Sequence, residues 1–317
     1  ENSLTLGLLP ALAALWLALR HLDGKPRVLP VGLCLGLAFL SKPEVFLAGA
    51  GGVCAAWACA WWVQRWELAR ILRTLGVTLL GIMIPIVVAS ALLATAMDLK
   101  TAVWGALGSW PAMFGSGATD LLFYQRGMGL EDLGSSLNGI GVTAGLWLLV
   151  VALAMGAGLG VAKLPAAWRW PAAILATALV TTAGIMSFTA LDWHRAPRPL
   201  QFILLLVIAI AASRLAAIRR THSSASDTAI PQIAGLAYAS FAGILLLKMI
   251  FNVRVYHYGF VLAMPATMLA STALVAWIPH WIRERSGRGA TSAGRGCGRR
   301  ATGAGGVCSR SGRSFTG

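Results

Sequence analysis

A long apolar stretch with a single polar interruption constrains this chain more than any other feature. In residues 28–63 the only charged side chains are Lys42 and Glu44, on either side of Pro43. A continuous helix over these roughly 36 residues would be about 54 Å long, whereas the hydrocarbon core of a bilayer is about 30 Å thick. Proline disrupts a helix interior. The sequence therefore predicts two membrane-spanning helices that meet in a tight turn at Pro43.

The rest of the chain has the same apolar character. Hydrophobic residues make up 57% of the 317 residues and charged residues only 12%, and the mean hydropathy is +0.73, values that exclude an ordinary soluble globule. We predict an all-α fold, a polytopic transmembrane helix bundle over residues 1–285 with about nine spans. The predicted spans lie near 4–20, 28–41, 45–63, 74–97, 139–162, 171–191, 199–213, 230–251 and 258–279. The spans 28–41 and 199–213 are short for a membrane helix.

The orientation of the spans follows from the Lys and Arg residues between them, because cytoplasmic loops carry an excess of positive charge. With segment 20–27 inside, about twice as many Lys and Arg residues fall on the inner side as on the outer side. Most of the positive charge behind the net value of +15 then lies in the predicted inner loops and in a basic tail. It does not indicate a nucleic-acid partner. We expect an integral protein of a bacterial inner membrane.

The only long loop is the predicted outward loop 98–138. Its first part places Trp104, Leu107, Trp110 and Phe114 on one apolar helical face, which is typical of a short amphipathic helix in the plane of the membrane interface. Pro111 is expected to limit or kink this helix. The glycine-rich remainder is typical of irregular turns.

Residues 286–317 are rich in Gly, Arg, Ala and Ser and contain no acidic residue, so they are predicted to be disordered. Three interpretations stay open: electrostatic attachment to anionic lipid on the cytoplasmic side, which we favour, an RNA-binding tail, and an out-of-frame translation of GC-rich DNA. Sequencing the end of the gene distinguishes the last from the others. The chain also begins at Glu1 and enters an apolar segment at once, and we expect it to be a fragment.

Charged side chains cluster at the outer ends of the spans, and because ionisable groups are costly at membrane depth, each cluster is a candidate site. The candidate substrate-binding residues are Lys42, Glu44, Arg195, Arg198, Arg254 and His257. Arginine forks match phosphate oxygens, and Lys42 could contact an anionic headgroup while Glu44 holds it or binds a second group. The alternative for Lys42 and Glu44 is a solvated turn. The alternative for the clusters 192–198 and 252–259, which hold the other four residues, is that they only anchor the helices at the membrane interface. No metal-ligand spacing is recognised, and Glu131 and Asp132 are not interpreted as a catalytic pair.

Residues 11–52, ALAALWLALRHLDGKPRVLPVGLCLGLAFLSKPEVFLAGAGG, resemble the C-type membrane glycosyltransferases of the protein mannosyltransferase and aminoarabinose transferase group. The motif is a Leu-rich helix, a basic inner loop and an ending of the Gly-Leu-Ala-Leu-Leu-Thr-Lys type, which stands here as residues 36–42 followed by Pro43. Lys42 alone matches a motif position.

The resemblance implies transfer of a sugar from a polyprenyl-phosphate carrier to an acceptor on the outer face, and some members use a divalent metal. It implies that Lys42 neutralises the phosphate as the sugar leaves. The catalytic carboxylate of the family belongs to a loop after the first span that has no counterpart here, so the catalytic residue is unknown. The alternatives are a transporter or flippase-like protein, which should show ionisable residues near the middle of the membrane, and a non-catalytic membrane scaffold.

Overall fold

The computed structural model describes residues 2–22, 27–108, 110, 122–186, 193–220, 226–253 and 258–277, and it is all-helical over these ranges. The α-helices are α1 (Asn2–Leu22), α2 (Val28–Ser41), α3 (Pro43–Gln64), α4 (Leu68–Ala94), α5 (Leu99–Leu107), α7 (Leu122–Met128), α8 (Leu133–Lys163), α9 (Ala166–Met186), α10 (Leu200–Arg220), α11 (Ser226–Leu247) and α12 (Tyr258–Thr272). A short 3₁₀ turn, η1 (Trp193–Arg195), precedes α10. The predicted all-α class is confirmed for these residues.

Seven described helical stretches are long and apolar enough to cross a membrane, which indicates an integral membrane protein. Each of the nine predicted spans overlaps a described helix. The two that are not among the seven overlap α2, which has only 14 residues, and α9, and these two stay predictions.

Several predicted span boundaries differ from the observed helices, and two of them illustrate the physical reason. The predicted span 199–213 stops before the first basic residue, whereas α10 continues through Arg214 to Arg220 and buries Leu215. Similarly, α8 begins at Leu133, earlier than the predicted span at 139. In both places polar residues occupy the end turns of a longer helix, where they can reach the membrane surface.

The predicted turn in the first apolar stretch is confirmed. α2 ends at Ser41, and Lys42 has an extended backbone, with φ −157° and ψ 135°. Pro43 is the first residue of α3, a position where its missing N–H would have no helical partner in any case. The amide of Lys42 still donates to the carbonyl of Ala38, at 3.1 Å, and closes α2.

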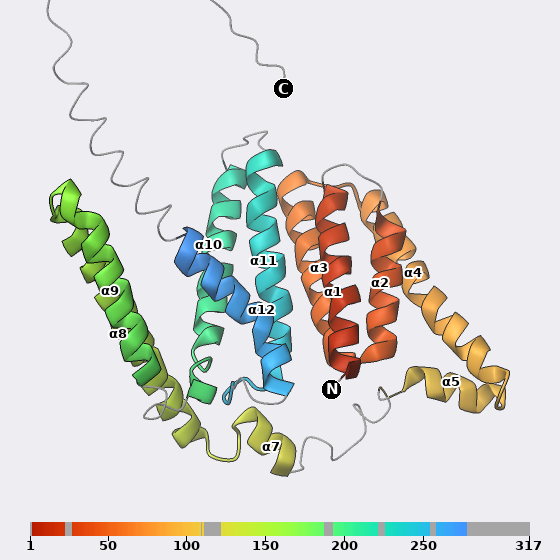
Figure 1. Ribbon diagram of the computed structural model, residues 1–317. Coiled ribbons are helices and arrows are strands. Elements are labelled where there is room, and N and C mark those ends of the chain that lie inside the picture. Colours follow the sequence, from red (N-terminus) through yellow and green to blue (C-terminus); the bar gives the residue numbers. More distant parts are fainter. Residues whose placement is uncertain are drawn as a thin grey trace, which may run out of the picture. The chain divides into compact units, whose positions relative to one another are not determined.

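The core lies among α1, α2, α3, α10, α11 and α12, and small residues let these helices approach closely. In Figure 1, α3 lies next to α11, and the two helices pack extensively. A Cβ built on Gly32 of α2 would lie 2.3 Å from the carbonyl oxygen of Thr78 and 2.8 Å from the Cα of Gly81 on α4. The backbones of α2 and α4 therefore touch, as in membrane helix pairs with small residues at the contact.

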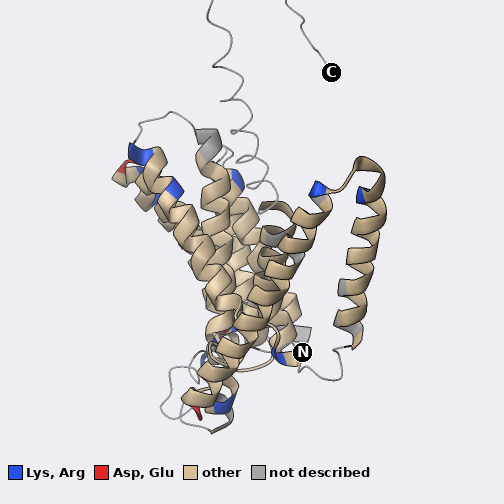
Figure 2. Cartoon of the chain, turned by 90° about the vertical axis from the view of Figure 1, so that its left-hand side faces the viewer, with Lys and Arg blue, Asp and Glu red and all other residues tan. Residues whose placement is uncertain are grey.

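Apolar side chains also cover much of the outer surface of the helices. On α4, Leu79, Val87 and Leu92 are exposed, and on α8 Leu148 is 71% exposed. A surface of this kind is unfavourable in water and matches the hydrocarbon of a bilayer. Figure 2 shows the Lys and Arg residues near the helix ends and other residue types along the helix middles.

The first part of the loop 98–138 forms a helix, α5, which ends before Trp110, so the predicted amphipathic helix with its four-residue apolar face stays a prediction. Asp98 caps the start of α5, because its side chain accepts a hydrogen bond from the Thr101 amide at 2.9 Å, and this bond lowers the pKa of Asp98 below its ordinary value. The helix ends at Gly108, whose φ of 57° favours glycine, and not at Pro111. Its location in a membrane interface stays a prediction.

Residues 122–138 of this loop, which the structure describes, are helical over most of their length. The described part holds α7 and the first turn of α8 where irregular turns were expected. Trp110 stacks on Phe39, with ring centroids 4.7 Å apart, and also contacts Phe46 edge-on, so the loop is joined to α2 and α3. Phe114 lies outside the described residues.

The chain divides into one unit of residues 1–270 and a second unit of residues 271–317. In the second unit the structure describes residues 271–277, which include a π-helical turn, η2 (Ala273–Trp277). The predicted tail, 286–317, lies outside the described residues.

Candidate functional site

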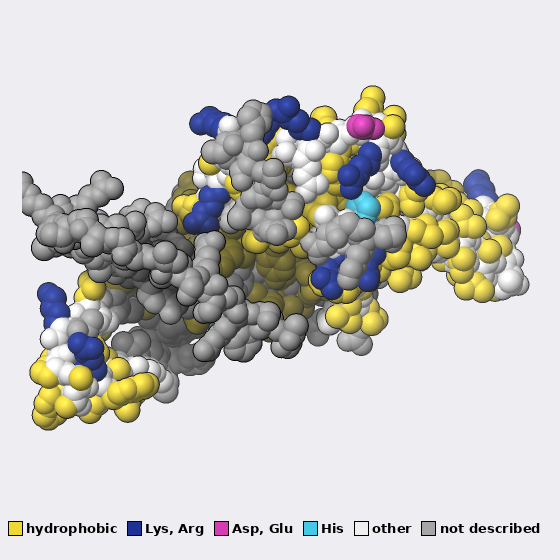
Figure 3. Space-filling view, turned by 90° about the horizontal axis from the view of Figure 1, so that it is seen from above, with side chains coloured by type: hydrophobic (Ala, Val, Ile, Leu, Met, Phe, Trp, Pro, Cys, Tyr) yellow, Lys and Arg dark blue, Asp and Glu magenta, His cyan; other side chains and the backbone are white. Residues whose placement is uncertain are grey.

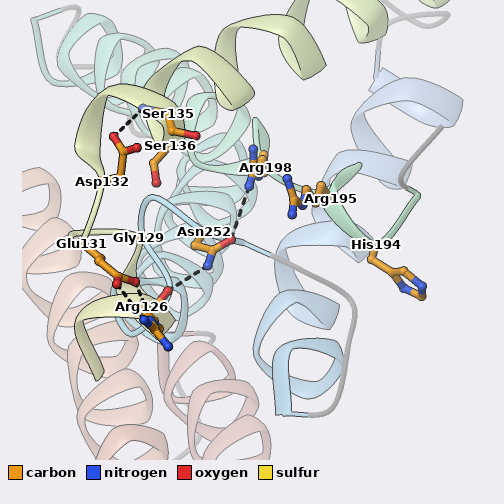
Figure 4. A pocket seen from close by; sticks show the side chains of 10 residues that line it. All are labelled: Arg126, Gly129, Glu131, Asp132, Ser135, Ser136, His194, Arg195, Arg198 and Asn252. Atoms are coloured by element: carbon orange, nitrogen blue, oxygen red, sulfur yellow. Dashed lines mark hydrogen bonds and ion pairs between the residues drawn. The ribbon is translucent and has the colours of Figure 1, made fainter. Parts of the chain in front are cut away.

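A pocket of about 490 Å³ opens beside the turn that precedes α10, and it gathers side chains from segments that are far apart in the sequence. Figure 4 shows its lining, with the carboxylates on one side and two arginines on the other. The lining residues are Arg126, Gly129, Glu131, Asp132, Ser135, Ser136, His194, Arg195, Arg198 and Asn252. They come from α7 and the turn after it, from the first turn of α8, from η1 and the segment that follows it, and from the segment after α11.

Arg198 is the buried arginine of this pocket, with only 8% of its surface exposed. Its amide donates to the carbonyl of Arg195 at 3.0 Å, in the tight turn between η1 and α10. Its Nη2 lies 3.5 Å from Oδ1 of Asn252. The guanidinium lies directly over Gly139 of α8, because a Cβ built there would be 1.7 Å from Nη1. A glycine is therefore what makes room for this side chain.

Arg126 and Glu131 form a two-pronged ion pair at the edge of the pocket. The Nε of Arg126 donates to Oε2 of Glu131 at 2.6 Å, and its Nη2 donates to Oε1 at 2.9 Å. Both side chains are exposed, so this ion pair adds little to the free energy of unfolding. Its main effect is to orient the two side chains. Asn252 connects it to Arg198, because its Nδ2 donates to the backbone carbonyl of Arg126 at 2.9 Å.

The turn between α7 and α8 is held against the segment after α11. The amide of Phe251 donates to the carbonyl of Met128 at 3.0 Å. Gly129 follows with φ 78°, and a Cβ there would meet the carbonyl carbon of Phe251 at 2.9 Å. Glycine is required at this position by both its backbone conformation and its space.

Asp132 immediately precedes α8 and lines the pocket. Its Oδ1 accepts a hydrogen bond from the Ser135 amide at 2.9 Å, which caps the helix. Ser135 and Ser136 add hydroxyl groups to the same wall. The pocket thus combines three arginines with two carboxylates and hydroxyls, a set that can bind an anionic group and hydrogen-bond a polar neighbour of it.

The structure brings together only part of the predicted site. Arg195 and Arg198 line the pocket, whereas Lys42 and Glu44 lie at the α2–α3 turn and do not line it. Arg254 and His257 lie outside the described residues. The segment after α11 connects the two places, since it supplies Asn252 to the pocket and Lys248 to Glu44.

Glu44 forms an ion pair with Lys248, in which Nζ donates to Oε1. Lys42 adds a weaker electrostatic interaction with the same carboxylate. The second group that Glu44 binds is therefore a lysine of this chain, and the pair fixes the end of α11 to the start of α3. The side chains of Lys248 and Glu44 are 38% and 24% exposed, so the pair is only partly screened by solvent.

We expect a double-mutant cycle of Glu44→Gln and Lys248→Met to give a coupling energy of about 0.5–1 kcal/mol, the range for partly exposed pairs. The measurement is the free energy of unfolding in mixed micelles. Lys100→Met is the control, because Lys100 is exposed and has no ion pair among the described residues. Additive single changes would contradict the predicted coupling.

Four pocket residues were missed as a group by the sequence analysis: Arg126, Glu131, Asp132 and Asn252. Glu131 and Asp132 were noted as adjacent carboxylates, but nothing in the sequence placed them beside Arg195 and Arg198. A local signal did exist, because an arginine five residues before a glutamate across Gly129 fits an ion pair that spans a turn. The role of Asn252 depends on contacts between distant segments and has no local signal.

No group of three His, Cys, Asp or Glu side chains that could hold a metal ion is found among the residues that the structure describes. Comparisons with protein-family models, curated proteins and solved structures found no match for this chain.

Proposed function

We propose that this membrane protein binds the phosphate of a polyprenyl-phosphate sugar donor in the pocket at Arg198 and serves in transfer of the sugar to an acceptor on the outer face. The observation that carries the proposal is the buried guanidinium of Arg198, held over Gly139 beside Arg195 and opposite the carboxylates Glu131 and Asp132. The sequence resemblance in residues 11–52 supports the same class of reaction.

The pocket chemistry fits such a transfer. As the bond between the anomeric carbon and the phosphate oxygen breaks, negative charge grows on the phosphate, and arginines held in place stabilise it. The acceptor oxygen forms the new bond to the anomeric carbon, and its proton passes to a base. We assign that role to Asp132, whose Oδ2 has no ion-pair partner among the described residues, whereas Glu131 is engaged by Arg126.

The proposal includes a membrane setting. The partners are the membrane lipid and the lipid-linked donor, and the protein resides in a bacterial inner membrane with its tail on the cytoplasmic side. The excess of Lys and Arg in the predicted inner loops supports this orientation. Lys42 stays a proposed phosphate contact from the turn between α2 and α3.

A transporter or flippase-like protein is the second candidate, because an anion that is moved across the membrane would also need an arginine-lined pocket. The position of the charges favours the transferase. In Figure 2 the described Lys, Arg, Asp and Glu residues lie near helix ends, whereas coupled transport commonly uses ionisable groups near the middle of the membrane.

The two candidates differ in the fate of the donor. Membranes that contain the protein would be supplied with polyprenyl-phosphate sugar labelled in the sugar. The transferase should move the label to a new acceptor and release polyprenyl phosphate, and Arg195→Gln should slow both. Movement of the intact labelled donor between leaflets, without release of polyprenyl phosphate, would overturn the transferase proposal in favour of transport.

A further inference from the structure

At the end of the helices opposite the Lys42 turn, arginine side chains lie over tryptophan rings, and we call this set the Trp–Arg cluster. The guanidinium carbons of Arg20 and Arg27 lie 5.6 and 5.8 Å from the ring centroid of Trp16. Arg70 lies over Trp66 at 4.2 Å, and Arg219 lies over Trp62 at 4.6 Å. All four distances are in the range of cation–π contacts.

These contacts join helices that are far apart in the sequence. Arg219 is in the last turn of α10 and reaches a tryptophan of α3. His21, in the last turn of α1, packs edge-on against Trp66, with ring centroids 6.2 Å apart. The cluster is therefore a common surface formed by the ends of α1, α3 and α10 and the starts of α2 and α4.

The surface around the cluster is strongly positive. Figure 3 looks onto this end, and Lys and Arg side chains surround a histidine there, with an acidic side chain nearby. Of the side chains that the structure describes at this end, Glu67 is the acidic one. Trp16 and Trp62 remain partly exposed, 54% and 39%, beside the arginines that cover them.

An arginine stacked on an indole is prepared to bind phosphate. The contact with the ring reduces the freedom that the side chain loses on binding, and guanidinium N–H groups match the oxygens of a phosphate. Tryptophan side chains favour the headgroup level of a bilayer, and basic side chains there attract anionic lipids. The cluster thus combines a position at the headgroup level of the bilayer, positive charge and hydrogen-bond donors, and these three properties suit a lipid phosphate.

We propose that the Trp–Arg cluster is a binding surface for acidic phospholipid headgroups. It lies at the opposite end of the helices from the pocket at Arg198, and the inference does not rest on the proposed function of that pocket. It is also distinct from the basic tail, because each residue that forms it belongs to a described helix or turn.

The test compares the association of spin-labelled phosphatidylglycerol and phosphatidylcholine with the full chain in mixed bilayers. We expect a preference for phosphatidylglycerol that falls at least tenfold in the variant Arg20→Gln, Arg27→Gln, Arg70→Gln and Arg219→Gln, because each basic side chain near an anionic surface contributes a factor of roughly five. Trp62→Leu, which keeps every charge, should lower the preference less but measurably. An unchanged thermal transition in phosphatidylcholine alone would show that the variants are folded.

The matched control is the variant Arg73→Gln and Arg214→Gln, which removes two exposed arginines that stack on no tryptophan among the described residues. In this control the preference for phosphatidylglycerol should fall clearly less than in the variant Arg70→Gln and Arg219→Gln. Equal losses in the two pairs would overturn the proposal in favour of unspecific electrostatic attraction. Displacement of the labelled lipid by millimolar inorganic phosphate would overturn it as well, because the surface would then bind the free anion.

Discussion

Replacing Gly32 with alanine should separate α2 from α4 and lower the free energy of unfolding by about 1–3 kcal/mol, or prevent folding altogether. The added methyl group would lie 2.3 Å from a backbone oxygen, that of Thr78, and 2.8 Å from the Cα of Gly81. Neither atom belongs to a side chain that could rotate away. The helix backbones would have to move apart, and the packing between α2 and α4 would be lost.

Gly76→Ala on α4 provides the matched control, because a Cβ at that position meets no atom within 4 Å. This change should stabilise the protein by roughly 0.5–1 kcal/mol, since alanine is the better helix former. Both variants would be measured by unfolding in mixed micelles with increasing denaturing detergent. Equal stability of the two variants would contradict the close contact between α2 and α4.

Replacing Gly139 with alanine should displace the guanidinium of Arg198 and weaken binding of an anionic ligand in the pocket at least tenfold, which corresponds to about 1.4 kcal/mol. The new Cβ would lie 1.7 Å from Nη1 and 3.0 Å from Cζ of Arg198. The side chain is buried, so it has little room to keep its position. This change leaves every charge in the pocket and therefore tests the placement of Arg198.

Gly141→Ala is the control for this second prediction. It lies two residues further along the same helix, and a Cβ there meets nothing within 4 Å. It should bind the ligand as the unchanged protein does. If Gly139→Ala bound equally well, the position of Arg198 over α8 would not matter for binding.

The parts of the fold that depend on local patterns could be predicted from the sequence. The break at Pro43 follows from the length of an apolar stretch, and the helices follow from apolar runs near the thickness of a bilayer. Boundaries were less accurate where a charged residue such as Arg214 lies inside an end turn, because a charge near a helix end can reach the membrane surface.

The site could be predicted only in part. The pair Arg195 and Arg198 was recognised, since two arginines in one outward turn are unusual. Asn252, the partner of Arg198, and the ion pair of Arg126 and Glu131 come from other segments. Their approach depends on packing between distant helices, which no local pattern records. Gly139 illustrates this best, because its role is visible only once the guanidinium of Arg198 lies over it.

The central claim is that the pocket at Arg198 binds a lipid-linked phosphate, and a binding titration in detergent micelles tests it most directly. The protein would be titrated with polyprenyl phosphate and with the matching polyprenyl alcohol, which has the same chain without the charge. We predict that the phosphate binds at least tenfold more tightly than the alcohol, and that Arg198→Gln removes most of this difference. Equal affinity for phosphate and alcohol, or a preference that Arg198→Gln leaves intact, would contradict the claim.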